Sequence, residues 1–474
     1  MDNFCTFVVR IKHYIWIAIV EGKNYIFHSF LIVFIIALIF GSLSVVDTEQ
    51  KLLGYSLKPI HMFSDVLPDV VEPIDSTLAQ AVIIPAVEKP DTCPEGMVCI
   101  QNFTSETHPL DPLFGKLQHS RRGSEKVRIA WFGDSFTDAD LVVCDLRDSL
   151  QSVFGGNGVG FVPITHEAAG YRRSVMHSFG GWISSSVVSR KGNANFGING
   201  FNYRPDSANY VRFAATRKFK HTRKFDIFRL FYASSVQTQA RIALNDTIHQ
   251  QLTLSPTNGP EMLAISQRGS RRVKLNFSEQ PGTVIYGASL EDSTGIYVDN
   301  FSIKGNSGLS LLSIPTRNLR MFDSLLNYDL IVLQFGLNAI TPESRKYSSY
   351  MQGMERVIKK FKTAFPNTPI LMLSVSDRSE RLNGEFVTMK AVKSLVAVQE
   401  RFAYDHKLLF WNLYEAMGGE NSMKHFVESN PSLASKDYTH LNFDGGRIIG
   451  HKLARSFLFE DQKFTERRKN LVAN

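Results

Sequence analysis

Short apolar runs alternate with amphipathic segments over much of the chain. The runs Ile129–Phe132 and Leu330–Phe335, each followed by Gly, are typical of strands buried on both faces of a sheet. Further strands are predicted at 369–375 and 408–411, and apolar residues at helical spacing predict helices over 138–154, 350–365, 389–404 and 445–457. Because strands alternate with helices, we expect an α/β domain with a parallel sheet covered on both faces, and reactive loops at the carboxyl ends of its strands.

The stretch 171–299 follows a different pattern. Apolar and polar residues alternate at 227–232, 240–244 and 283–286, and the runs are bounded by Asn, Gly, Ser and Pro. Since no long amphipathic helix is visible, the pattern predicts an all-β insert, a sandwich. The alternative is a set of long, partly ordered loops. The insert would divide the α/β domain into two parts, 112–170 and 300–474.

An apolar segment, 25–46, precedes all of this and contains no charged residue. At 1.5 Å per residue a helix of this length spans a bilayer, and a buried core helix is the alternative. Arg10, Lys12 and Lys23 precede it, while Asp47 and Glu49 follow it. The positive-inside rule therefore predicts a cytoplasmic N-terminus over 1–24, an uncleaved transmembrane anchor, and an exported remainder. The stretch 47–111 is rich in Pro, Asp, Glu and Ser, which predicts an extended stalk.

Composition and charge narrow the function classes. The chain is 43% hydrophobic and 21% charged, as is ordinary for globular proteins, with a net charge of +8. Basic residues such as those of 271–274 are scattered along the sequence and predict solvated faces, so we expect no nucleic-acid partner. No Cys/His spacing predicts a metal site, and no cofactor is expected. Cys93 and Cys99 are close enough in sequence for a local disulfide, while Cys144 lies in a helical pattern and is expected to be buried.

The sequence Gly133-Asp134-Ser135 follows the first predicted strand and is the strongest candidate for chemistry. A hydroxyl in a turn at the end of a core strand is well placed to react, although Asp134 and Ser135 could merely cap the next helix. A serine nucleophile needs a base, a group that orients the base, and donors for an oxyanion. Asp437 and His440 lie three residues apart in a predicted loop, and Asn338 follows the strand Leu330–Phe335. The flexible stretch 305–308 could supply a backbone N–H.

The order Gly-Asp-Ser, Ser-Gly, Gly-x-Asn, Asp-x-x-His resembles the four blocks of the SGNH/GDSL hydrolase superfamily. The resemblance covers about 127–168 and 300–457 and implies a three-layer α/β/α fold. It implies Ser135 as nucleophile, His440 as base and Asp437 as its orienting partner. The oxyanion hole would consist of the backbone N–H groups of Ser135 and Gly308 and the side-chain amide of Asn338. Gly305 competes with Gly308 for the backbone donor.

Two further stretches, 146–163 and 286–291, resemble bacterial envelope SGNH proteins that remove O-acetyl groups from peptidoglycan or related glycans. In those proteins the insert resembles a carbohydrate-binding module. Phe136 departs from them, because a small or polar residue often follows their serine. The resemblance implies a membrane-anchored serine esterase, with its catalytic domain in the periplasm or outside the cell and an acetylated glycan as substrate. An O-acetyltransferase with the same triad and a non-catalytic glycan-binding scaffold are the alternatives.

Overall fold

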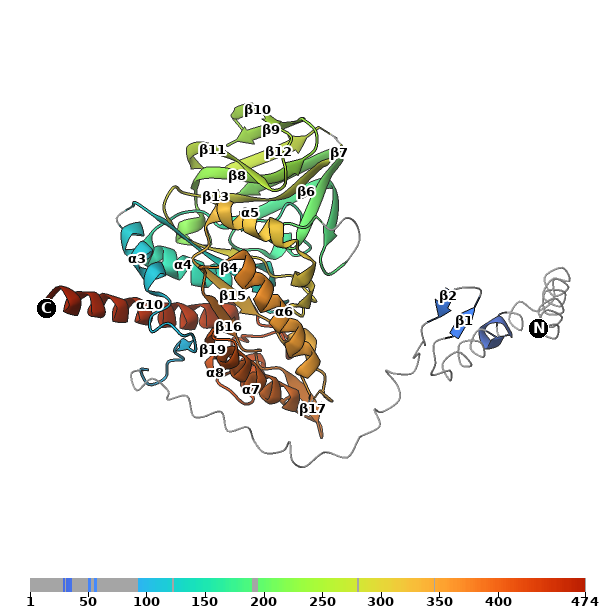
Figure 1. The fold of residues 1–474 in the computed structure, drawn as a ribbon, viewed down its shortest axis with the longest axis vertical. Coiled ribbons are helices and arrows are strands. Elements are labelled where there is room, and N and C mark those ends of the chain that lie inside the picture. The colour runs from blue at the N-terminus through green and yellow to red at the C-terminus, as the bar shows by residue number, and fades with distance from the viewer. Residues whose placement is uncertain are drawn as a thin grey trace. The chain divides into compact units, whose positions relative to one another are not determined.

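The structure is a computed structural model that describes residues 29, 31–35, 50–52, 55–57, 93–121, 123–189, 195–278, 281–344 and 346–473 (Figure 1). The chain divides into two compact units, 1–86 and 87–474. In the first, β1 (Gln50–Leu52) and β2 (Tyr55–Leu57) pair antiparallel. The predicted cytoplasmic segment 1–24 and most of the predicted anchor 25–46 lie outside the described residues. Within the described part of the chain, no helix has the length and apolar character needed to cross a membrane.

The second unit is built on a sheet of six strands. Its order is β14 (Gly295–Asn300), β4 (Lys126–Gly133), β15 (Leu330–Gln334), β16 (Ile370–Leu373), β19 (Leu409–Trp411) and β3 (Gln101–Asn102). The first five strands are parallel, and β3 adds antiparallel to β19. The predicted parallel sheet is thus confirmed.

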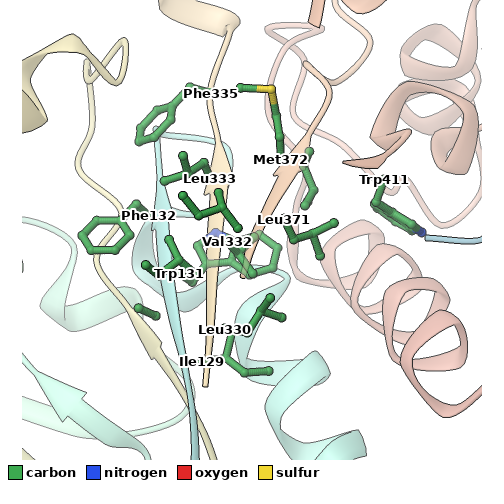
Figure 2. Packing of buried hydrophobic residues seen from close by; sticks show 14 of the residues in the cluster. Ile129, Trp131, Phe132, Leu330, Val332, Leu333, Phe335, Leu371, Met372 and Trp411 are labelled. Carbon is green, nitrogen blue, oxygen red and sulfur yellow. The ribbon is translucent and has the colours of Figure 1, made fainter. Parts of the chain in front are cut away.

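The central strands are buried because apolar side chains project from both of their faces. Trp131 and Phe132 are neighbours on β4 and both are fully buried, as are Val332 and Leu333 on β15 (Figure 2). Successive side chains of a strand point to opposite faces, so such runs need a cover on each side.

Helices supply that cover. One group, whose members contact one another, comprises α3 (Asp111–Ser120), α4 (Val143–Phe154) and α10 (Phe443–Ala473). The contacting pair α5 (Thr316–Leu326) and α6 (Ser348–Ala364) lies on the other side of the sheet (Figure 1). The remaining helices are α7 (Lys390–Asp405), α8 (Leu413–Met417) and α9 (Ser422–Glu428). This is a three-layer α/β/α arrangement.

The helix predicted over 138–154 begins later, at Val143. Residues Asp138–Asp140 form a short 3-10 turn, and Asp140 and Val142 have left-handed φ values of 69° and 66°. Both carboxylate oxygens of Asp140 accept hydrogen bonds from the buried Arg147, at 2.8 and 2.9 Å. A bidentate pair of this kind is strong when buried, and we attribute the strained turn to it.

The insert forms one antiparallel sheet of nine strands. They are β5 (Gly160–Val162), β6 (Met176–Ser186), β7 (Phe201–Ala214), β8 (Phe225–Ser234), β9 (Thr238–Leu244), β10 (Ile248–Leu254), β11 (Glu261–Ser270), β12 (Arg272–Phe277) and β13 (Thr283–Glu291). Side chains from β7 and β12, such as Phe213 and Val273, share a core with Phe228 and Ile285 of β8 and β13. The expected all-β insert is therefore a single hydrogen-bonded sheet that encloses its own core, instead of two separate sheets.

The domain boundaries differ from the predicted ones in three places. Strand β5, expected in the α/β domain, pairs with β13 of the insert. Strand β14, expected in the insert, pairs with β4. The end of the expected stalk belongs to the folded unit, because Ile100, Phe103 and Leu110 are buried in the α/β core. Local composition does not indicate which strands pair over a long distance in the sequence, so these boundaries were predicted wrongly.

Two features hold the start of the second unit. Cys93 and Cys99 form a disulfide, whereas Cys144 is free and buried. The indole N–H of Trp411, on β19, lies 3.0 Å from the carbonyl oxygen of Val98 and 3.1 Å from the hydroxyl of Ser456 on α10. The disulfide-bonded segment is thereby tied to the sheet and to the last helix.

A buried ionic cluster joins the insert to the α/β sheet. Glu291, at the end of β13, forms ion pairs with Arg128 of β4, with Lys126 at 2.5 Å and with Arg229 at 2.7 Å. Burial acts to raise the pKa of Glu291, but the three cations lower it to about 2. Arg128 also donates to Asp299 of β14 at 2.9 Å. Removing one partner of such a cluster leaves an uncompensated buried charge, so its geometry restricts the orientation of the insert.

Candidate active site

The candidate site lies where the strand order of the α/β sheet reverses. In chain order the parallel strands are β4, β14, β15, β16 and β19. The strand that follows β4 in the chain, β14, lies on one side of it, and the later strands, beginning with β15, lie on the other side. A crevice forms at the carboxyl ends of strands at such a switch point, and open α/β sheets bind ligands there. Ser135 lies two residues beyond the end of β4, and Asn338 lies four residues beyond the end of β15.

Ser135, His440 and Asp437 form a continuous chain of hydrogen bonds. The Ser135 hydroxyl lies 2.8 Å from His440 Nε2, and His440 Nδ1 lies 2.7 Å from Asp437 Oδ2. The other carboxylate oxygen of Asp437 accepts from the backbone N–H groups of Thr439 and His440, both at 3.0 Å. Burial opposes ionisation of Asp437, but its bonds with His440 and these N–H groups hold its pKa below the ordinary value. The three residues that sequence reasoning grouped are thus brought together with the geometry of a catalytic triad.

The loop that carries His440 is supported by a hairpin that the sequence analysis did not identify. Strands β17 (Ser379–Leu382) and β18 (Glu385–Thr388) pair antiparallel. The ring of Phe386 in this hairpin stacks on Tyr438 with centroids 3.6 Å apart, and Ser379 N–H donates to the carbonyl of Tyr438 at 3.0 Å. Tyr438, which lies between Asp437 and His440 in the sequence, has a left-handed φ of 53°. We attribute the strained turn, which brings Asp437 back onto His440, to these contacts.

The residues before Ser135 are tightly packed. A Cβ atom on Gly133 would lie 2.3 Å from the Thr137 hydroxyl and 2.7 Å from that of Ser302, so only glycine fits there. Asp134 is fully buried; its Oδ1 accepts from Phe136 N–H at 2.9 Å, whereas Oδ2 has no hydrogen-bond partner among the residues that the structure describes. Burial raises the pKa of Asp134 to about 6, against the lowering effects of Phe136, Gln334 and Leu337. The Gly-Asp-Ser turn therefore does more than cap a helix: its acidic residue is an interior group.

Asp134 makes stability depend on pH in a defined direction. Because its folded pKa of about 6 exceeds the unfolded value of 3.8, the folded state binds a proton more tightly than the unfolded state does. Its contribution is therefore fully present below pH 3.8 and is lost as pH rises through 6. Between pH 4 and 7, we expect the unsubstituted protein to lose about 2 kcal/mol of unfolding free energy relative to the Asp134→Asn variant.

Urea unfolding at several pH values measures this difference, and titrations common to both proteins cancel in it. The exposed Asp206→Asn serves as the control and should follow the unsubstituted protein at every pH. A constant difference between Asp134→Asn and the unsubstituted protein across pH 4–7 would show that Asp134 does not titrate as described.

Two of the three predicted oxyanion donors, Gly308 and Asn338, bind Asn306, a buried residue that was not among the predicted site residues. The Asn338 side-chain N–H donates to the Asn306 carbonyl at 3.1 Å, and Gly308 N–H donates to Asn306 Oδ1 at 2.8 Å. Asn338 is exposed and keeps a second N–H, whereas the one N–H of Gly308 is engaged. Gly308 has a left-handed φ of 92° and is buried, whereas the competing Gly305 is exposed. The oxyanion roles of Ser135, Gly308 and Asn338 remain predictions, and that of Gly308 requires its bond to Asn306 to be shared or broken.

Nothing in the described residues groups three or more His, Cys, Asp or Glu side chains so as to hold a metal ion. The side chains named above offer a hydroxyl, an imidazole, a carboxylate and amide donors.

Comparison with family models finds no match, and comparison with curated proteins finds none either. Among solved structures, one described as "Peptidoglycan O-acetylesterase in action, 5 min" matches with a TM-score of 0.65 and 21% identity, covering 77% of this chain and 99% of that chain. A family two carbohydrate esterase from Cellvibrio japonicus matches with a TM-score of 0.26 and 10% identity over 60% of this chain and 99% of its own, too low to bear on the fold. The likeness at 0.65 confirms the predicted resemblance at the level of fold. The chain therefore shares its fold with the structure described as a peptidoglycan O-acetylesterase.

Proposed function

We propose that the protein is a serine esterase that removes O-acetyl groups from a cell-envelope glycan, with peptidoglycan as the leading candidate. The observation that carries the proposal is the hydrogen-bonded chain Ser135–His440–Asp437 at the switch point of the sheet. The fold shared with the peptidoglycan O-acetylesterase supports the choice of substrate.

The geometry supports a two-step mechanism. Ser135 Oγ attacks the acetyl carbonyl while His440 Nε2 takes its proton, and Asp437 stabilises the imidazolium that forms. Collapse of the tetrahedral intermediate breaks the ester bond, and His440 returns the proton to the departing sugar oxygen. A water molecule, deprotonated by His440, then attacks the acetyl-serine, and acetate leaves as Ser135 regains its proton. Hydrolysis thus consumes one water per ester and requires no cofactor.

Acetate release from O-acetylated peptidoglycan tests the proposal. The purified full-length chain should release acetate from the acetylated polymer and none from polymer that was first de-O-acetylated with mild alkali. Adding an unacetylated glycan acceptor separates hydrolysis from transfer, because a transferase would move label from the polymer to the acceptor instead of releasing acetate. Binding of the polymer without any turnover of an acetyl ester would contradict the esterase proposal and support the alternative of a non-catalytic glycan-binding scaffold.

Asn338 is the side-chain donor whose loss should be most visible. We expect Asn338→Ala to lower kcat for an acetyl ester by roughly 10²- to 10³-fold with little change in KM, because the amide would stabilise charge that develops only in the transition state. Steady-state kinetics on 4-nitrophenyl acetate measures both constants. Asn367→Ala, an exposed site in the turn before β16, is the matched control. A rise in KM at unchanged kcat would instead assign Asn338 to substrate binding.

We also propose that the segment 25–46 anchors the protein in a bacterial cell membrane, with the catalytic domain in the periplasm or outside the cell. The uncharged length of this segment motivates the proposal, and the disulfide Cys93–Cys99 suits an oxidising compartment. Carbonate extraction of membranes and protease digestion of spheroplasts test the two parts. Release of the protein by carbonate, or protection of the catalytic domain in intact spheroplasts, would overturn them.

A further inference from the structure

A large basic groove lies on the β insert, outside the candidate active site. Its volume is about 950 Å³, and none of the residues that line it is acidic. We name it the arginine groove, because five of the residues that line it are arginines: Arg212, Arg217, Arg223, Arg271 and Arg272. In the sequence these residues are spread over sixty positions and look like scattered surface charge.

Antiparallel pairing explains how the fold gathers them. Ala214 of β7 stands opposite Met176 of β6 on one side and Arg272 of β12 on the other. Residues directly opposite in paired strands project from the same face, so these three form one row across the sheet. The small side chain of Ala214 at the centre of the row leaves the floor hollow. The neighbouring Phe213 and Val273 point to the opposite face and are fully buried.

Most of the positive charge in the groove is not neutralised by the protein. Asp246 pairs with Arg272 at 2.9 Å and more distantly with Arg212 at 3.6 Å. For Arg217, Arg223 and Arg271, which are all exposed, the described residues provide no ion-pair partner within 4.0 Å. A guanidinium group presents a planar fork of N–H donors that matches the two oxygens of a carboxylate or phosphate. A concave surface with several such forks attracts anions more strongly than isolated surface charges do.

The groove adjoins the candidate active site through strand β6. Immediately before this strand, the guanidinium of Arg173 lies 3.8 Å from the ring centroid of Phe443, three residues beyond His440. Ser174 donates to Asp140 at 2.5 Å, and Met176 lines the groove itself. Three residues of chain span at most about 10 Å, so a polymer of a few sugar units can contact both places.

We propose that the arginine groove binds an anionic glycan, a polysaccharide whose carboxylate or phosphate groups engage the arginines while another part of the chain enters the candidate active site. That the polymer is a glycan rests on the proposed function, whereas the anion-binding character rests on the groove alone. Single-stranded nucleic acid is the competing polyanion. Its binding sites typically supply aromatic side chains on which bases stack, and no Phe, Tyr or Trp lines this groove.

Binding of polygalacturonate to the full-length chain tests the proposal, with fully methyl-esterified polygalacturonate as the uncharged polymer of the same backbone. Fluorescence anisotropy of end-labelled polymer should show binding of the charged form, weakened by added salt, and none of the esterified form. We expect the double variant Arg217→Gln with Arg271→Gln to weaken binding by roughly tenfold or more, because each arginine contributes charge-assisted hydrogen bonds. Arg204→Gln with Arg241→Gln is the matched control, since both residues are exposed on the insert outside the groove and the charge change is the same.

Retained affinity in the control and lost affinity in the groove variant would support the proposal. Equal losses in both would show that only net surface charge matters and would overturn it, as would the absence of binding by the unsubstituted chain. Tighter binding of a single-stranded oligonucleotide at equal charge would overturn it in favour of a nucleic-acid site. Hydrolysis of 4-nitrophenyl acetate by the unsubstituted chain tests the proposed function separately. If the chain does not hydrolyse this ester, the esterase proposal is wrong, but the proposal that the groove binds anions is unaffected.

Discussion

Replacing Ser135 with alanine should lower kcat/KM for 4-nitrophenyl acetate by roughly 10⁴- to 10⁶-fold. The physical reason is that His440 would have no hydroxyl to deprotonate, so the acetyl-enzyme could not form. What remains is acceleration by the oxyanion donors and by binding, and these act without a nucleophile on the protein. Rates over a range of enzyme concentrations, corrected for spontaneous hydrolysis, measure the loss.

The matched control is Ser152→Ala, which removes a hydroxyl from the exposed face of α4 and should keep full activity. Ser135→Ala should also unfold at nearly the same temperature as the unsubstituted protein, because Ser135 is only partly buried. Retention of more than about a tenth of the activity by a correctly folded Ser135→Ala protein is incompatible with the triad.

Asp437→Asn should lower kcat/KM by roughly 10³- to 10⁴-fold, a smaller loss than that of the nucleophile. The asparagine side chain is nearly the same size but no longer carries the charge that stabilises the imidazolium. It can also turn its amide N–H toward His440 Nδ1, which favours the tautomer whose Nε2 carries a proton and points it at Ser135. The Asp437 side chain is 49% exposed, and water screens part of its charge, so we place the expected loss below that of a fully buried triad carboxylate.

Asp444→Asn separates orientation from charge. Asp444 lies four residues beyond His440 at the start of α10, is similarly exposed, and pairs with Arg447 at 2.5 Å. It alters the local charge by the same amount without contacting His440, so its kcat/KM should change by no more than a few-fold. Equal losses in Asp437→Asn and Asp444→Asn would mean that the general field around His440 matters and that Asp437 has no orienting role.

Much of the fold follows from local patterns. The buried strands β4 and β15 are continuous apolar runs, and no amphipathic helix or half-exposed strand produces that pattern. Helices α6 and α7 follow from apolar residues at helical spacing. Ser135, Asp437 and His440 were identifiable because each sits in a short motif at the end of a predicted element, where parallel strands bring loops together.

Other features depend on contacts between residues far apart in sequence. The left-handed turn at 138–142 reflects the pairing of Asp140 with Arg147 and Ser174, and the local helical pattern points the other way. The boundary between the domains is displaced because β14 pairs with β4 while β5 pairs with β13. Asn306 accepts hydrogen bonds from two of the candidate oxyanion donors, Gly308 and Asn338, although nothing in its neighbouring sequence marks it.

The sequence by itself determined the α/β class, the all-β insert, the candidate triad and the uncharged segment 25–46, because each of these follows from the types and spacing of neighbouring residues. Only the tertiary structure decided that Asp134 is an interior acid, that a hairpin stacks on Tyr438, and that five arginines from separate strands and loops line one groove. These properties depend on burial, register and long-range pairing. The environment of a side chain depends on the strands that pack beside it. When those strands are distant in the sequence, the local pattern of residues does not indicate which of them will become neighbours.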